Sequence, residues 1–163
     1  MLAEAASGTR SGPSQKALIT GYDALFRSRI GQSIEPEVIV RFGHGSTSKS
    51  VSQWVRSKGQ GKLLVVNRSG RRHDPEHASH RVLESDPQDL IAAIHIDTVP
   101  KRSTSPWFSR WLKYESTIQD AARTALASED MWEAQVAHSL VHSLPEGAGL
   151  HVANSMPIRD LDA

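Results

Sequence analysis

The sequence predicts an α/β fold: a Rossmann-like three-layer domain with a mostly parallel sheet, followed by the first helices and strand of a second α/β domain. Short β-branched runs alternate with helical patterns in the first hundred residues, which is typical of βαβ units. One of these runs, residues 63–66, is apolar throughout, as in a strand covered on both faces. A chain of 163 residues, 38% of them hydrophobic, is long enough to bury a core.

The first third of the chain predicts a lead-in, a helix, a strand and a second helix. Residues 1–14 are mostly small and polar and predict a flexible lead-in. Residues 14–29 carry apolar side chains at helical spacing and predict an amphipathic helix. A β-branched run over 38–42 predicts a strand, and the serine and threonine cluster at 46–48 predicts the N-cap of the next helix.

The middle of the chain predicts two further strands and a helix. Residues 63–66 and 80–83 are the strands, separated by a polar loop. Asp86 as N-cap and Pro87 at the first helical position predict the start of a helix. Residues 98–106 hold two prolines and no apolar pattern, and we interpret them as a linker between domains.

The last part of the chain predicts two helices, a strand at 149–153 and a polar turn at 154–159. A strand that feeds a turn with no helix after it favours a chain that continues in the full protein. We therefore expect a central domain over 15–103 and the truncated start of another domain over 104–163. The helical faces are Trp107, Trp111, Tyr114 and Ile118 in one helix and Trp132, Val136 and Leu140 in the other.

The charge is balanced overall but uneven along the chain. Residues 1–110 hold 16 basic and 10 acidic side chains, whereas residues 111–163 hold 3 and 8, for a net charge of +1. This asymmetry predicts an anion-binding face or a surface for an acidic neighbour, with a solvated mixed surface as the alternative. The densest basic stretch comprises Arg56, Lys58, Lys62, Arg68, Arg71, Arg72 and Arg81.

Composition excludes several classes of protein. Without cysteine there are no disulfides, Cys-ligated metals or thiol nucleophiles. No apolar run reaches the roughly 18 residues of a membrane span, and no signal peptide is visible, so we expect a cytoplasmic protein without membrane contact. A pI near 8.2 is low for a nucleic-acid-binding domain, and we expect no such partner.

The segment 43–50 lies between a predicted strand and a predicted helix. Backbone N–H groups at a helix N-terminus, with Lys49 beside them, are suited to bind an anion. The segment differs from a Walker A loop by Ser48 in place of the second glycine, and Asn67 ends the next strand where a Mg²⁺-binding Asp is expected. Three interpretations stay open: a carboxylate or other anion site, a plain capped turn, and a degenerate P-loop nucleotide-binding domain.

The turn at 154–159 is a second candidate. Asn154, Ser155 and Arg159 follow directly on the predicted strand, where ligands bind in open α/β sheets, and an arginine can hold a carboxylate bidentately. An ordinary surface turn is the alternative. The histidines His73, His77 and His80, and the pair His138 and His142, are interpreted as surface residues rather than metal ligands.

Three segments resemble the MenD family of thiamine-diphosphate-dependent 2-succinyl-5-enolpyruvyl-6-hydroxy-3-cyclohexene-1-carboxylate synthases. They are VIVRFGHGSTSKSVSQWV at 38–55, HDPEHASHRVLESDPQDLI at 73–91 and LHVANSMPIRDLD at 150–162. The resemblance implies the central domain of a longer transferase, which decarboxylates 2-oxoglutarate and adds the succinyl unit to isochorismate in menaquinone or phylloquinone biosynthesis. It also implies a homo-oligomer, a dimer or tetramer.

By the same resemblance, Asn154, Ser155, Arg159 and Lys49 bind substrate, with Arg159 on a carboxylate. Ser50 stands where some members carry an arginine. The family's activating glutamate and its Gly-Asp-Gly segment for Mg²⁺ (or Mn²⁺) and the diphosphate lie outside this chain. We therefore expect no catalytic residue, metal or cofactor in this piece, which alone is expected to be inactive. The alternative is a non-catalytic anion-binding or regulatory module.

Overall fold

The computed structural model describes residues 1–10, 16–71, 73–94, 105–128 and 131–162. The chain divides into two compact units, one formed by residues 26–105 and the other by residues 1–25 together with 106–163. The compact units divide after residues 25 and 105, and the domain boundaries after residues 14 and 103 stay a prediction. We call the two parts the sheet unit and the helical unit.

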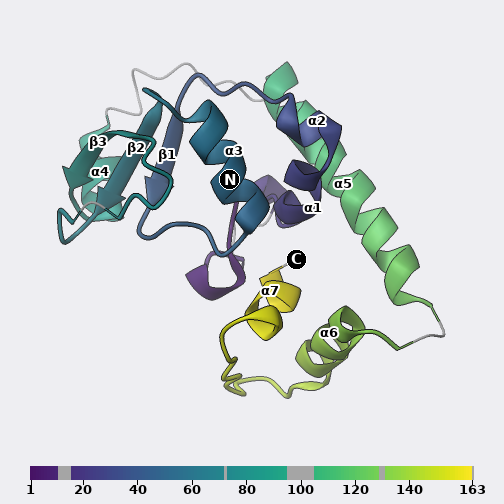
Figure 1. The fold of residues 1–163 in the computed structure, drawn as a ribbon. Helices are drawn as coiled ribbons and strands as arrows, with labels where there is room; N and C mark the ends of the chain where they lie inside the picture. Colours follow the sequence, from purple (N-terminus) through teal and green to yellow (C-terminus); the bar gives the residue numbers. More distant parts are fainter. Residues whose placement is uncertain (11–15, 72, 95–104, 129–130, 163) are drawn as a thin grey trace. The chain divides into compact units, whose positions relative to one another are not determined.

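The sheet unit contains three parallel strands, which confirms the predicted α/β class with a parallel sheet. These are β1 (Ile39–Phe42), β2 (Leu63–Asn67) and β3 (Ser79–Glu84). Their order is β1-β2-β3, and both neighbouring pairs are parallel (Figure 1). On β2, Leu63, Val65 and Val66 are fully buried, as the unbroken apolar run predicted.

The two helices that follow strands begin at the predicted caps. Helix α3 (Lys49–Lys58) has Ser48 as N-cap, whose hydroxyl accepts a hydrogen bond from the Val51 N–H. Helix α4 (Pro87–Ala93) has Asp86 as N-cap, accepting from the Gln88 N–H, with proline at the start of the helix. Each cap satisfies one of the backbone donors that a helix N-terminus leaves without an intrahelical partner.

The core of the sheet unit forms around Trp54. Its ring lies 4.5 Å from that of Phe26, between ring centroids, and its indole N–H donates to the Ile34 carbonyl at 3.2 Å. The short helix α2 (Arg29–Gln32) lies just before Ile34 in the sequence. The buried apolar side chains of this unit are Phe26, Ile34, Val51, Trp54, Val55, Leu63, Val65, Val66 and Ala78.

The described part of the helical unit includes a short 3-10 helix, η1 (Ala5–Ser7), most of α1 (Tyr22–Arg27), and the helices α5 (Pro106–Leu126), α6 (Glu133–Ser143) and α7 (Met156–Asp162). Helix α7 packs against α6 and η1. The two long helices confirm the periodicity after residue 106, although Trp107 and Trp132 are each 46% exposed. In the described residues, no helix is long and apolar enough to span a membrane.

The predicted single helix over 14–29 is wrong. Ile19 forms a parallel bridge with Leu2, and residues 18 and 20 have no helical structure; helix α1 begins only at Tyr22 and ends at Arg27. Two β-branched residues followed by Gly21 are poor helix formers, and Met1–Ala3 offers a backbone partner in their place. Within the predicted flexible lead-in, Leu2 forms this bridge and residues 5–7 form η1; the flexibility stays a prediction, and residues 11–14 lie outside the described residues.

The predicted strand at 149–153 is wrong as well. This segment has no regular structure, and none of the strands that the structure describes pairs with it. A strand persists only where its N–H and C=O groups find partners. The predicted polar turn is limited to Asn154 and Ser155, because α7 begins at Met156. The predicted linker at 98–106 lies outside the described residues up to 104, and Pro106 already opens α5.

Candidate carboxylate-binding site

Lys49 lies at the start of α3, directly after the loop that leaves β1. Gly43 begins this loop at a φ of +80°, a conformation that glycine adopts without steric cost. The Lys49 side chain is exposed and has no hydrogen bond or ion pair with the described residues. It therefore presents an unpaired ammonium group beside a helix N-terminus, where the helix dipole also favours an anion.

A shallow pocket of about 450 Å³ lies beside this loop, within the sheet unit. Glu76 lies next to this pocket in the sequence. It forms a buried ion pair with Arg41, in which Glu76 Oε2 lies 2.7 Å from Arg41 Nη1. Arg41 also donates to the carbonyl of His73, whose ring lies 4.5 Å from that of His44 between centroids. The lining residues are Gly45, Ser46, His73, Asp74, Pro75 and His77.

Asp74 fixes the turn that forms one wall of this pocket. Its carboxylate accepts hydrogen bonds from the Ala78 N–H at 3.0 Å, the Ser79 N–H at 2.9 Å and the Ser79 hydroxyl at 2.6 Å. Burial acts to raise the pKa of Asp74, but these hydrogen bonds and the nearby Arg41 charge outweigh it, so the pKa lies below its ordinary value. Three donors thus already bind the Asp74 carboxylate, which favours its anionic form and a structural role in this turn.

Part of the basic stretch is neutralised by acids that lie outside it in the sequence. Lys58 and Lys62 both form ion pairs with Glu35, and Arg68 pairs with Asp86. The hydrogen bond from Lys58 lowers the pKa of Glu35. These contacts favour the solvated mixed surface that the sequence left open for this stretch, because exposed pairs of this kind leave little net field.

The second group of predicted residues lies in the helical unit, around the start of α7. Asn154 and Ser155 form the turn, and Arg159 lies in the middle of the helix; all three side chains are exposed. Ser155 has a φ of +79°, which is uncommon for a residue with a side chain. The Arg159 guanidinium has no hydrogen bond or ion pair within the described part of the chain, so its donors are available to an anion.

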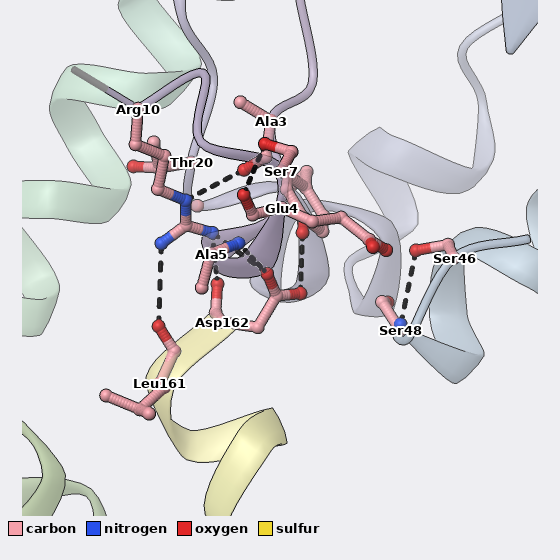
Figure 2. A network of polar contacts seen from close by, with 12 residues as sticks. Ala3, Glu4, Ala5, Ser7, Arg10, Thr20, Ser46, Ser48, Leu161 and Asp162 are labelled. Carbon is pink, nitrogen blue, oxygen red and sulfur yellow. Dashed lines mark hydrogen bonds and ion pairs between the residues drawn. The ribbon is translucent and has the colours of Figure 1, made fainter. Parts of the chain in front are cut away.

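A buried polar network fixes α7, and no local pattern in the sequence marks it (Figure 2). Asp162, the last described residue of α7, is 3% exposed. Its carboxylate accepts hydrogen bonds from the Tyr22 hydroxyl at 2.5 Å, the Ala5 N–H at 2.8 Å and Arg10 Nη2 at 3.0 Å. Burial, followed by the hydrogen bond to Asp162, raises the pKa of Tyr22.

A second network joins the start of α1 to α5. The Glu115 carboxylate accepts hydrogen bonds from the Thr20 N–H at 3.0 Å, the Thr20 hydroxyl at 2.7 Å and the Gly21 N–H at 3.0 Å. Gln119 donates to the Thr20 hydroxyl at 3.0 Å. A carboxylate at a helix N-terminus satisfies free backbone donors and the positive end of the dipole. Neither network could be predicted from spacing, because their members are about 95 and 140 to 157 residues apart.

The structure brings Asn154, Ser155 and Arg159 together on one turn and one short helix, but Lys49 belongs to the other unit. The described residues hold no group of three His, Asp or Glu side chains able to bind a metal ion. The sequence also has no Gly-Asp-Gly segment.

Comparison with known proteins places these features in a family. Residues 6–152 match the protein family described as "Middle domain of thiamine pyrophosphate". The chain belongs to this family. The match confirms the resemblance that the three sequence segments indicated, and it runs across the domain boundary predicted after residue 103.

Members with curated names extend the match to nearly the whole chain. The chain is 30% identical, over 99% of its length, to the 2-succinyl-5-enolpyruvyl-6-hydroxy-3-cyclohexene-1-carboxylate synthase of Bacillus cytotoxicus. It is 32% identical to the synthase of that name from Geobacillus kaustophilus and 30% identical to that of Listeria monocytogenes, again over 99% of the chain. In each case the chain spans 28% of the length of the relative.

Proposed function

We propose that this chain is the central part of a thiamine-diphosphate-dependent synthase. In the proposed reaction, 2-oxoglutarate loses CO₂ and its remaining four-carbon unit is joined to isochorismate, as a step of menaquinone or phylloquinone biosynthesis. The match to the thiamine pyrophosphate middle domain and the curated synthases support this proposal. We further propose that residues 15–103 form the central domain and residues 104–163 begin the diphosphate-binding domain.

The observation that carries the proposal is the exposed Arg159, which has no partner among the described residues, beside the Asn154–Ser155 turn. Both proposed substrates are polycarboxylates, and a guanidinium is the side chain best suited to hold a carboxylate bidentately. Asn154 and Ser155 add an amide and a hydroxyl that can donate to the same oxygens. Lys49 contributes a second cation, from the sheet unit. We propose these four residues as substrate ligands.

The chain is proposed to bind and orient substrate while thiamine diphosphate and Mg²⁺ (or Mn²⁺) are held elsewhere in the full-length protein. Bound there, the cofactor supplies carbanion stabilisation. On this proposal the 163-residue chain alone has no activity. The partners are the two substrates and further copies of the chain in a homo-oligomer, for which the half-exposed Trp107 and Trp132 offer apolar surface.

Kinetics of the full-length protein test the assignment of Arg159. Arg159→Ala is expected to raise the KM for 2-oxoglutarate or isochorismate by roughly 10-fold to 150-fold, the loss of about 1.5–3 kcal/mol from a charge-assisted contact. Arg159→Lys should recover only part of this, because lysine lacks the bidentate fork. Arg110→Ala, which removes an exposed arginine of α5, is the matched control. Unchanged KM values for both substrates in Arg159→Ala would remove Arg159 from the site.

A non-catalytic anion-binding module is the second candidate, favoured by Lys49 at the start of α3, whose ammonium group has no partner in the part of the chain that the structure describes. Calorimetric titration of the 163-residue chain with 2-oxoglutarate separates the two. The module is supported by two results together: saturable binding to the 163-residue chain that Lys49→Ala abolishes, and no synthase activity in the full-length protein. Turnover by the full-length protein supports the synthase.

A further inference from the structure

We propose that Asp162 is a positioning residue, whose buried carboxylate holds α7 so that Arg159 meets the carboxylate of the substrate. The proposal rests on the function proposed above and adds residues that neither the sequence pattern nor the relatives assign: Asp162, Arg10 and Tyr22. None of the three is proposed to touch substrate. They act through the helix that carries Arg159; Figure 2 shows the polar contacts of Arg10 and Asp162 at the end of this helix.

Helix α7 needs an anchor because it is too short to be stable alone. It has seven residues, whereas isolated helices below about 12 residues are marginal in water. It packs against α6 and η1, yet Asp162 is its only buried residue. The other α7 side chains are exposed or partly exposed, so tertiary packing of an apolar face is weak here.

The carboxylate of Asp162 ties α7 to three other places in the chain. Oδ2 accepts from the Tyr22 hydroxyl at the start of α1, and Oδ1 accepts from the Ala5 N–H of η1 and from Arg10. Tyr22 is 1% exposed, so its hydroxyl has no water to replace this acceptor. The donors belong to three separate parts of the chain. Together the three hydrogen bonds fix both the place and the orientation of the carboxylate, which a single hydrogen bond would not do.

Arg10 closes the C-terminal end of the same helix. Its Nη2 donates to the Asp162 carbonyl at 2.8 Å and its Nη1 to the Leu161 carbonyl at 3.5 Å, while Nε donates to the Ala3 carbonyl at 2.8 Å. The last carbonyls of a helix lack intrahelical partners, and a cation there also favours the negative end of the dipole. Arg10 thus links the end of α7 to the bridge-forming segment of residues 1–3.

This anchor determines where Arg159 can reach. Arg159 precedes Asp162 by three residues, about one turn, so the two side chains leave neighbouring parts of the helix surface. A bidentate arginine–carboxylate contact depends on the position and orientation of the guanidinium plane. If the contacts of Asp162 are lost, α7 can tilt or fray and the Arg159 guanidinium occupies several positions. Substrate binding is then weaker although every contacting group is still present.

A double-mutant cycle in the full-length protein tests this, with the KM for the carboxylate substrate that Arg159→Ala affects as the readout. Asp162→Asn is expected to raise this KM by about tenfold, and the milder Tyr22→Phe by about threefold. If Asp162 acts through Arg159, adding Asp162→Asn to Arg159→Ala changes the KM by less than about twofold. Full multiplication of the two effects would overturn the proposal, since a general structural defect also weakens binding when Arg159 is absent.

Hydrogen exchange of the α7 amides gives an independent readout. Asp162→Asn and Tyr22→Phe should both speed exchange in residues 156–162, whereas Tyr114→Phe, which alters the other tyrosine of the helical unit, should change neither exchange nor KM. If Asp162→Asn and Tyr22→Phe speed exchange but leave the KM unchanged, while Arg159→Ala still raises it, the positioning role of Asp162 is overturned. The proposed substrate site at Arg159 then still stands. An unchanged KM in Arg159→Ala itself overturns the site and the positioning together.

Discussion

Gly21 lies where α5 leaves no room for a side chain. A Cβ at this position would meet Ile118 Cγ2 at 2.5 Å, closer than any ordinary contact. Its N–H is also held by Glu115 at 3.0 Å, so the backbone cannot move away without breaking that hydrogen bond. The start of α1 is therefore fixed by the close packing of Gly21 and by the Glu115 carboxylate. The predicted helix over 14–29 took neither contact into account.

Replacing Gly21 should destabilise the protein through this close approach. Gly21→Ala is expected to lower the free energy of unfolding by about 1–3 kcal/mol, the usual effect of overpacking. Urea denaturation followed by circular dichroism measures it. Gly149→Ala is the matched control, because a Cβ there would have no other atom within 4 Å. Equal stability of the two variants would contradict the tight packing of Gly21 on α5.

Ser155 adopts a left-handed backbone conformation at the entrance to α7. Ser155→Gly should raise the free energy of unfolding by up to about 1 kcal/mol. Glycine removes a steric cost of about 1–2 kcal/mol that a side chain causes in this backbone region. Part of this gain is offset because glycine makes the unfolded chain more flexible. Ser57→Gly, within α3, should instead lower it by about 0.5–1 kcal/mol. A stability loss in Ser155→Gly would show that the hydroxyl contributes more than the strain costs.

At the scale of elements, the structure separates what local sequence determines from what it does not. Caps act over three or four residues, so the sequence predicts Asp86 and narrows the other cap to residues 46–48; the structure places it at Ser48. The strand predicted at 149–153 failed because strand formation depends on a partner, which no local pattern supplies. The same reason explains residues 18–20, where an extended partner at Met1–Ala3 outweighs helical spacing.

The turn closed by Asp74 predicts a pH dependence for the sheet unit. The pKa of Asp74 is lowered from 3.8 in the folded protein, so the folded state binds its proton less readily than the unfolded chain does. The stabilisation is fully present above pH 3.8 and is lost as the pH falls through the lower, folded-state pKa. Denaturation curves between pH 6 and pH 2.5, about the range over which carboxylates titrate, should show this loss.

The matched pair Asp74→Asn and Asp89→Asn isolates that carboxylate. Asp74→Asn should flatten the pH dependence and lower the free energy of unfolding at neutral pH by about 1–3 kcal/mol, because a buried acceptor of several donors is changed. Asp89 is exposed in the first turn of α4, so its replacement should lower the free energy of unfolding by no more than a helix-dipole contact contributes, about 0.3–1 kcal/mol, which is less than for Asp74→Asn. Parallel curves for the wild type and Asp74→Asn would contradict the assignment.

At the scale of the full chain, the class of the fold could be predicted from the sequence, the residues of the candidate site stay a prediction, and the support of α7 could not be predicted. Asn154, Ser155 and Arg159 are neighbours in the chain, so their proximity follows from the sequence. The anchor of Asp162 on Tyr22 and Arg10 spans 140 and 152 residues, and nothing local marks it. Lys49 lies in a separate compact unit, so its part in the same site stays a prediction.

Product formation by the full-length protein is the decisive measurement for the proposed synthase. With 2-oxoglutarate, isochorismate, thiamine diphosphate and Mg²⁺ present, we expect CO₂ release coupled one to one to the joined product. We expect none when the cofactor is omitted, and none from the 163-residue chain under the same conditions. Release of CO₂ by the chain alone, or a folded full-length protein that forms no product with all components present, would contradict the proposal.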